Sequence, residues 1–473
     1  RAATNYEGKK EVIYHAHSLG TLRTLIQPYQ TAAKYPLLIS IDDEWGLAMR
    51  IENTAQYPYA ISLGAIQGNL ELIHQMGENI AQDCKLAGIH WNLAPVADIN
   101  NNPDNPVIGY RSFGEDKVLV SQKAIAYMKG MQQQGLLTSV KHFPGHGDTS
   151  TDSHLALPLI DKTKKTLLEN ELYPFKQLIL EGVDSVMAGH LSVPALADGS
   201  TTSSSISKDV LKGLLRREMG YKGVIVSDAL NMHAVSKNYR ERGELEWLAF
   251  DAGNDVLCFA ENSAAGIETI FKNASSEQIE ESFARVWELK EKAFASTKKI
   301  PVSSTDPDKL NRTLALESLT LYSGTASAIA SFKEDGFVGI NVSSKPDCTF
   351  FNQLKKSIQF KAYDSATETP ESIERKINPQ ENILLAVYPP KVKPQNNFDL
   401  SQLELDLIND IMAQKKVTLY LFGNPYFLNL LNLRNTQTVV IAYQDFEVFQ
   451  ENAANHFLGK IKAKGKLPVT VRE

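Results

Sequence analysis

The feature that most constrains the fold is a rhythm in the first 260 residues. A short apolar run is followed by a loop and then by a segment with helical period. The runs are Pro36–Asp42, His90–Asp98, Leu136–His142, Val183–His190, Gly223–Asp228 and Asn254–Ala260. Continuous apolar runs are typical of strands buried on both faces of a parallel sheet. Amphipathic stretches predict helices between them, at about 115–134, 165–181, 208–219 and 240–252. This alternation predicts a βα-repeat fold.

The ends of the runs carry polar residues, namely Asp42, Asp98, Lys141 with His142, His190 and Asp228. In a TIM barrel the catalytic face is built at the carboxyl ends of the strands. Several polar strand ends therefore predict a shared mouth. The region before Tyr35 is polar and shows no convincing strand. We therefore expect a (β/α)8-type barrel whose early strands are missing or unrecognised.

A second, smaller unit follows. Residues 296–310 are rich in Ser, Pro, Lys and Asp and lack periodicity, which predicts a linker between a catalytic domain, 1–295, and a second domain, 311–473. A helix is expected at 401–414, among strands at Phe337–Val342, Ile383–Tyr388, Val417–Phe422 and Thr438–Tyr443. This pattern predicts a three-layer α/β sandwich.

Composition excludes some classes of protein. A chain of 473 residues suggests two or three domains, and a net charge of −6 argues against a general nucleic-acid binder. No apolar run approaches the roughly 18 residues of a transmembrane helix. The three cysteines are far apart and are expected to be small buried hydrophobes. Because the sequence starts at Arg1 without an initiator Met, we expect a missing upstream piece. Either removal of an export leader or trimming of the chain gives such a start, and export to the periplasm or cell surface is slightly favoured over a cytoplasmic location.

The most informative stretch is KHFPGHGDTSTDSHLALP, from Lys141 to Pro158, which holds three His and two Asp in an irregular loop after a strand. One interpretation is a metal site formed by His142, His146, Asp148 and His154, although the spacing is irregular. The favoured interpretation is acid/base chemistry. Asp152 and His154 can pair in a tight turn, and a histidine titrating near neutrality can both donate and accept a proton.

Asp228, in VIVSDAL, lies where a buried strand opens into a loop. A carboxylate there can attack an anomeric carbon, although a lone Asp often only caps a helix. Charged groups at other strand ends suit sugar hydroxyls, and the candidates are Asp42, Arg111, Lys141 and His142. Arg111 has an alternative as a structural ion pair with Glu115.

The segment KHFPGHGDTSTDSH closely resembles the signature of the β-N-acetylglucosaminidases of glycoside hydrolase family 3. The resemblance covers Pro36 to about Ala260 well and continues more weakly to the end. It implies a TIM barrel followed by an α/β sandwich, with Asp152 and His154 as the acid/base dyad and Asp228 as the nucleophile. Asp42, Arg111, Lys141, His142 and His190 match sugar-binding positions of the family.

Two departures from the family pattern stand out. The expected strands before Pro36 are not evident, and the usual D-x-E-G-G is here Asp42-Asp-Glu-Trp45-Gly46. The resemblance nevertheless implies a retaining, exo-acting β-N-acetylglucosaminidase that needs no metal or organic cofactor and serves cell-wall or chitin-derived sugar turnover. Two alternatives are a β-glucosidase or β-xylosidase of the same family and a non-catalytic glycan-binding protein. A neutral imidazole base beside Lys141 and Arg111 also suggests that phosphate competes with water as the acceptor.

Overall fold

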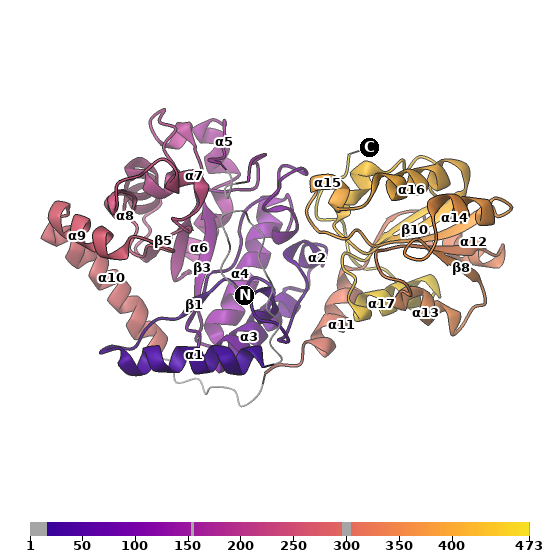
Figure 1. Ribbon diagram of the computed structural model, residues 1–473, viewed down its shortest axis with the longest axis horizontal. Helices are drawn as coiled ribbons and strands as arrows, with labels where there is room; N and C mark the ends of the chain where they lie inside the picture. The colour runs from indigo at the N-terminus through magenta and orange to yellow at the C-terminus, as the bar shows by residue number, and fades with distance from the viewer. Residues whose placement is uncertain (1–16, 153–155, 296–303, 473) are drawn as a thin grey trace. The chain divides into compact units, whose positions relative to one another are not determined.

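The computed structural model describes residues 17–152, 156–295 and 304–472. It forms two compact units (Figure 1). The first comprises Arg1–Tyr57, Leu70–Asn102 and Lys117–Pro307, and the second comprises Pro58–Asn69, Pro103–Asp116 and Asp308–Glu473. Two short segments that precede the predicted linker thus belong to the second unit, and helix α11 (Pro307–Ser318) begins within the stretch expected to be linker. The boundaries at 295 and 311 stay predictions.

A parallel sheet with strand order β1-β2-β3-β4-β5 forms the centre of the first unit. The strands are β1 (Ser40–Ile41), β2 (Trp91–Asn92), β3 (Leu137–Phe143), β4 (Ser185–Ala188) and β5 (Val224–Ser227). A parallel bridge between Val226 and Val256 adds the sixth predicted run beside β5. Every residue of β3, β4 and β5 is buried, which explains their continuous apolar character. The expected TIM-like parallel arrangement is confirmed for the described residues.

Helices connect the strands of this sheet and pack against them. They are α1 (Ser18–Ala32), α3 (Leu70–Ala87), α4 (Lys117–Gln133), α5 (Lys164–Glu169), α6 (Tyr173–Leu180), α7 (His233–Ser236), α8 (Glu244–Ala252), α9 (Ser263–Asn273) and α10 (Ser276–Phe294). A π-helix, η5 (Asp209–Glu218), and short 3-10 turns, η1 (Leu47–Met49), η3 (Pro194–Leu196) and η4 (Ser204–Ile206), complete the unit. The polar region before Tyr35 therefore contains a helix, α1, in its described part.

Helix α10 contributes to the core of the first unit. Its Leu289 is buried in one cluster with Trp91, Leu137 and Val226 from three strands. Val286 and Ala293, from the same side of α10, pack against this cluster. Apolar side chains from the strands are therefore covered by a helix that follows them in sequence.

The second unit is a mixed six-stranded sheet with strand order β6-β11-β10-β9-β7-β8, in which only β6 is antiparallel to its neighbour. The strands are β6 (Thr320–Ser323), β7 (Val338–Val342), β8 (Lys361–Asp364), β9 (Asn382–Val387), β10 (Lys416–Leu421) and β11 (Thr438–Ile441). Two separate apolar clusters lie on its two faces. The helices and turns are α2 (Ala60–Gly64), η2 (Gly109–Arg111), α12 (Ala326–Glu334), α13 (Thr349–Lys355), α14 (Pro370–Ile377), α15 (Gln395–Phe398), α16 (Gln402–Gln414), η6 (Pro425–Leu430) and α17 (Glu447–Phe457). The predicted α/β sandwich is confirmed.

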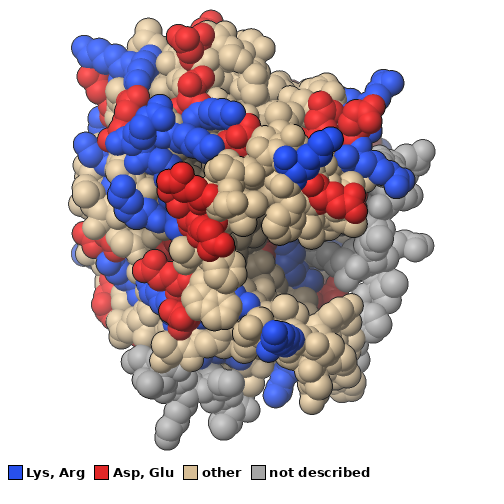
Figure 2. Space-filling view, turned by 90° about the vertical axis from the view of Figure 1, so that its left-hand side faces the viewer, with Lys and Arg blue, Asp and Glu red and all other residues tan. Residues whose placement is uncertain are grey.

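Basic and acidic side chains are interspersed over the face of the molecule shown in Figure 2. Among the described residues, no helix is both long and apolar enough to cross a membrane.

Candidate active site

Asp228 follows directly on β5, at the carboxyl end of the parallel sheet. Its backbone N–H donates to the carbonyl oxygen of Ala188, the last residue of β4, at 2.9 Å. One carboxylate oxygen, Oδ1, accepts from the N–H of Ala229 at 2.8 Å. The two contacts fix the position of the Asp228 backbone and carboxylate at the strand ends.

The surroundings of Asp228 favour its ionised form. Burial raises the pKa of this carboxyl group. The positive charges of His190 and His142, together with the Ala229 N–H, lower the pKa by more than burial raises it. The net result is a pKa below the ordinary value for Asp. Asp228 is therefore a carboxylate at neutral pH, which is the form that acts as a nucleophile.

His190 comes from the segment after β4 and is fully buried. Its Nδ1 lies 2.7 Å from the hydroxyl oxygen of Ser205, and its Nε2 lies 2.9 Å from the carbonyl oxygen of Ala229. Both ring nitrogens therefore contact protein groups. The prediction that His190 binds the sugar stays a prediction, and these contacts also give it a role in positioning the residue after Asp228.

His142 and Asp98 bring the ends of two neighbouring strand segments together. The Nδ1 of His142 lies 2.7 Å from Oδ2 of Asp98, whose side chain is fully buried. Asp98 also accepts from the backbone N–H of His142 and from that of His146. Burial raises the pKa of Asp98, but these partners lower it below the ordinary value. Asp98 thus orients the His142 ring and the start of the loop after β3.

Lys141 is the centre of an ion-pair network. Its Nζ, on a side chain only 2% exposed, lies 2.7 Å from both Asp42 Oδ1 and Glu44 Oε1. The other oxygen of Asp42, Oδ2, lies 2.7 Å from Nη2 of Arg50. Two cations and two carboxylates therefore balance one another in the network. Fixed charged donors and acceptors at the strand ends suit the hydroxyl groups of a sugar.

The loop residues considered as metal ligands have separate partners. Nδ1 of His146 lies 2.7 Å from Oγ1 of Thr149, and Asp148 forms an ion pair with Lys162 at 2.8 Å. Within residues 17–152, 156–295 and 304–472, no group of three or more His, Cys, Asp or Glu side chains is arranged to hold a metal ion. Asp152 is half-buried, and its carbonyl oxygen accepts from the Ala156 N–H. His154 lies outside the described residues.

One other residue, Cys258, differs from its sequence-based interpretation. Cys258, expected to be a small buried hydrophobe, is half-buried, and its thiol lies within the electrostatic influence of Asp228, Asp42 and Lys141. Arg111 belongs to the second unit, in η2. Its role in binding stays a prediction. Glu115, its suggested ion-pair partner, accepts hydrogen bonds from the N–H and hydroxyl of Thr470.

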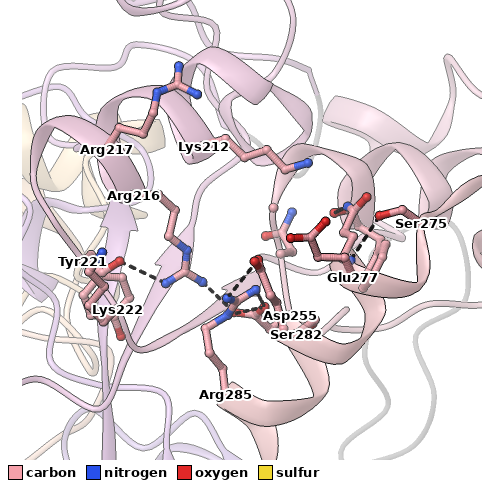
Figure 3. Close-up of a pocket in the computed structure, with 15 residues that line it drawn as sticks. Lys212, Arg216, Arg217, Tyr221, Lys222, Asp255, Ser275, Glu277, Ser282 and Arg285 are labelled. Atoms are coloured by element: carbon pink, nitrogen blue, oxygen red, sulfur yellow. Dashed lines mark hydrogen bonds and ion pairs between the residues drawn. The ribbon is translucent and has the colours of Figure 1, made fainter.

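A cavity of about 590 Å³ lies elsewhere in the first unit (Figure 3). Tyr221 and Lys222, which line it, precede β5, so this cavity is at the amino end of the strand and Asp228 is at the other end. Within it, the buried Asp255 binds Arg216 at 2.7 Å and Arg285 at 2.9 Å. The Asp255 carboxylate thus joins two arginines, one from η5 and one from α10, which indicates a structural role.

The chain is similar to known proteins over much of its length. The model of the glycosyl hydrolase family 3 N-terminal domain matches residues 12–289. The β-hexosaminidase A of Pseudoalteromonas piscicida is 30% identical over 383 residues, which are 73% of this chain and 62% of that protein. The β-hexosaminidase of Glaesserella parasuis is 33% identical over 261 residues, or 54% of this chain and 74% of that one.

A solved structure is also similar over nearly the whole chain. A glycoside hydrolase family 3 β-N-acetylglucosaminidase from Paenibacillus sp. has a TM-score of 0.80 and 29% sequence identity. The match covers 96% of this chain and 90% of that one. The similarity therefore includes both units.

Proposed function

The chain belongs to glycosyl hydrolase family 3, and from this premise we propose that it is a retaining, exo-acting β-N-acetylglucosaminidase. It would remove terminal β-linked N-acetylglucosamine from glycans derived from cell walls or chitin. The names of the relatives, β-hexosaminidase and β-N-acetylglucosaminidase, support this substrate class. The chain spans 62% of the length of the P. piscicida relative.

The observation that carries the proposal is the place and ionisation of Asp228. It is a carboxylate at the carboxyl end of a buried parallel strand, and its pKa is held below the ordinary value despite burial. In a retaining glycosidase a carboxylate attacks the anomeric carbon and forms a glycosyl-enzyme ester. Asp228 is the candidate for that attack.

The proton transfers are assigned to His154, with Asp152 as its partner. In the first step an Asp228 oxygen bonds to the anomeric carbon, the glycosidic bond breaks, and His154 donates a proton to the leaving oxygen. In the second step water attacks the same carbon, His154 takes a proton from that water, and the ester to Asp228 breaks. Asp152 would orient the imidazole and stabilise its charged form.

The sugar would be held by the groups around Asp228. Asp42 and Lys141 present fixed charges to its hydroxyls, and Arg50 and Glu44 keep both in place. His142, oriented by Asp98, and His190 would line the same pocket. Sugar binding by Arg111 stays a prediction from the sequence. No step of this mechanism requires a metal or organic cofactor.

Initial rates on an aryl N-acetylglucosaminide and on the matching aryl glucoside test the proposal. The wild-type chain should cleave the first much faster, and Asp228→Ala should lower that rate by a factor of order 10³ or more, because the covalent step is lost. Asp161→Ala removes an exposed carboxylate and is the matched control. Preference for the glucoside, or near-native turnover by Asp228→Ala, would overturn the assignment. Turnover of chitobiose and muropeptides would then define the natural glycan.

A further inference from the structure

We propose that Phe259 forms a stacking platform for the sugar ring or aryl group on the leaving-group side of the cleaved bond. This inference rests on the proposed glycosidase function and adds a residue that determines which substrates are bound. It derives from three observations on Phe259, which concern its place, its backbone conformation and its exposure.

Phe259 lies directly after the segment that pairs with β5. The N–H of Ser227 donates to the carbonyl oxygen of Val256, and that of Leu230 donates to the carbonyl oxygen of Cys258, both at 2.9 Å. The segment containing Val256 and Cys258 therefore ends beside Asp228. Phe259 is thus on the rim of the mouth formed by the strand ends.

Cys258, the residue before Phe259, lies close to the carboxylates of the site. Burial raises the pKa of the Cys258 thiol, and the negative charges of Asp228 and Asp42 raise it further, to about 12. The N–H of Cys258 also donates to Oγ of Ser227, the residue before Asp228, at 3.0 Å, which places Cys258 beside the nucleophile. Phe259, the next residue along the chain, is therefore adjacent to the space where a substrate would lie.

The backbone turns at Phe259. Val256 and Cys258 pack against the apolar cluster that contains Leu289 of α10, whereas Leu257 packs against a different cluster that includes residues of α8. Strict alternation along a strand would place Ala260 with Cys258. Ala260 instead packs on the same cluster as Leu257, and the φ of +47° at Phe259 marks the turn that causes this.

The turn leaves the Phe259 side chain 68% exposed. A positive φ is unfavourable for a bulky residue because its Cβ crowds the backbone, and an exposed ring gains little from burial. The fold therefore bears a conformational cost at Phe259 that packing does not offset. Strained, exposed residues at a pocket rim point to function, and an aromatic face is a good partner for the C–H groups of a sugar ring.

Two substrates with different leaving groups test the inference. Chitobiose places a second sugar where Phe259 would stack, whereas N-acetylglucosaminyl fluoride releases only fluoride. Phe259→Ala should lower kcat/KM on chitobiose about tenfold more than on the fluoride, since an aromatic contact of this kind contributes on that scale. Phe259→Tyr keeps the ring and should retain the wild-type ratio.

Phe271 supplies the matched control, because it is also 68% exposed but lies in the regular helix α9. Phe271→Ala should leave the ratio of the two substrates unchanged. A separate variant, Phe259→Asn, should raise Tm by about 2–4 °C, because Asn tolerates a positive φ.

The outcomes separate this inference from the proposed function. If the wild-type chain cleaves both substrates but Phe259→Ala affects them equally or not at all, the stacking role is wrong and the glycosidase assignment stands. If the wild-type chain cleaves neither substrate, both are wrong.

Discussion

The Nε2 atom of His190 lies 2.9 Å from the carbonyl oxygen of Ala229, the residue that follows Asp228. A carbonyl oxygen only accepts hydrogen bonds, so we infer that Nε2 carries a proton. Nδ1 then faces the hydroxyl of Ser205 at 2.7 Å. The ring therefore holds the backbone beside the proposed nucleophile, and its positive form lowers the pKa of Asp228.

This geometry predicts that His190→Gln changes the pH profile as well as the rate. Burial raises the pKa of Asp228 and the His190 charge lowers it, so removing that charge should move the acid limb of kcat/KM to higher pH. We expect kcat to fall about 10- to 100-fold, because the position of Asp228 is also less well defined. Ser205→Ala, which removes only the contact at Nδ1, should have a smaller effect. An unshifted acid limb in His190→Gln would show that the ring does not influence Asp228.

The acid/base dyad makes a prediction about leaving groups. His154→Ala should strongly reduce turnover of substrates with poor leaving groups, which need protonation, and should affect activated aryl substrates less in the first step. Asp152→Ala should show the same pattern in milder form. Rates across a series of aryl N-acetylglucosaminides with different phenol pKa values measure this. Equal losses along the series would limit His154 to binding or to the shape of its loop.

Asp43, next to the Lys141 network, should make stability depend on pH. Its side chain is fully buried, and its Oδ1 has no hydrogen-bond partner among the described residues. Burial is the main cause that raises the pKa of Asp43, and the negative charges of Asp83 and Glu44 raise it too, whereas a hydrogen bond from Cys84 lowers it. The resulting pKa is about 7. The unfolded chain loses this proton near the ordinary value of 3.8. The contribution of Asp43 to stability is therefore full below that pH and is lost as the pH rises to about 7.

Asp43→Asn should remove this dependence. The free energy of unfolding of Asp43→Asn minus that of the wild-type chain should be about 2–3 kcal/mol larger at pH 8 than at pH 5, because each pKa unit corresponds to about 1.4 kcal/mol. Denaturant unfolding at the two pH values measures the difference, and Asp161→Asn, at an exposed position, should show no such trend. A constant difference between Asp43→Asn and wild type at both pH values would contradict the prediction.

The structure limits the expected competition by phosphate. The sequence suggested positive potential from Lys141, but Asp42 and Glu44 each lie 2.7 Å from its ammonium group. We therefore expect water to be the main acceptor and N-acetylglucosamine 1-phosphate to be a minor product at high phosphate. Glu44→Gln removes one counter-charge and should increase the share of sugar phosphate. Product analysis in phosphate and in a non-nucleophilic buffer of equal pH and ionic strength tests this, and no sugar phosphate from either protein would refute it.

The sequence predicted the parts of the fold that rest on fully buried strands. The runs around Val140 and Val226 are apolar because both faces of these strands are covered, and a continuous apolar run can be recognised in the sequence alone. β6 and β8 were missed because each is a four-residue edge strand and only partly buried. The packing of Leu289 of α10 against the strands was also not predictable, since it depends on contacts far apart in sequence.

The positions of the candidate residues were predictable because Asp42 and Asp228 directly follow strands and Lys141 lies near the end of β3, whereas their roles stay predictions. The partners that fix them were missed. Neither the ion pair of Glu44 with Lys141 nor the contact of Ser205 with His190 has a local signal in the sequence. Such pairs form only when distant segments meet in the folded chain.

The central claim is that Asp228 forms a covalent bond to the sugar. An N-acetylglucosaminyl fluoride with a second fluorine at C5 slows breakdown of the glycosyl-enzyme, because the added fluorine destabilises the oxocarbenium-like transition state. Mass spectrometry of peptides from the inactivated protein then locates the sugar. We predict one added sugar, on the peptide containing Asp228, and none in Asp228→Ala. A sugar on another carboxylate, or none on a wild-type protein that still turns over the reagent, would contradict the mechanism.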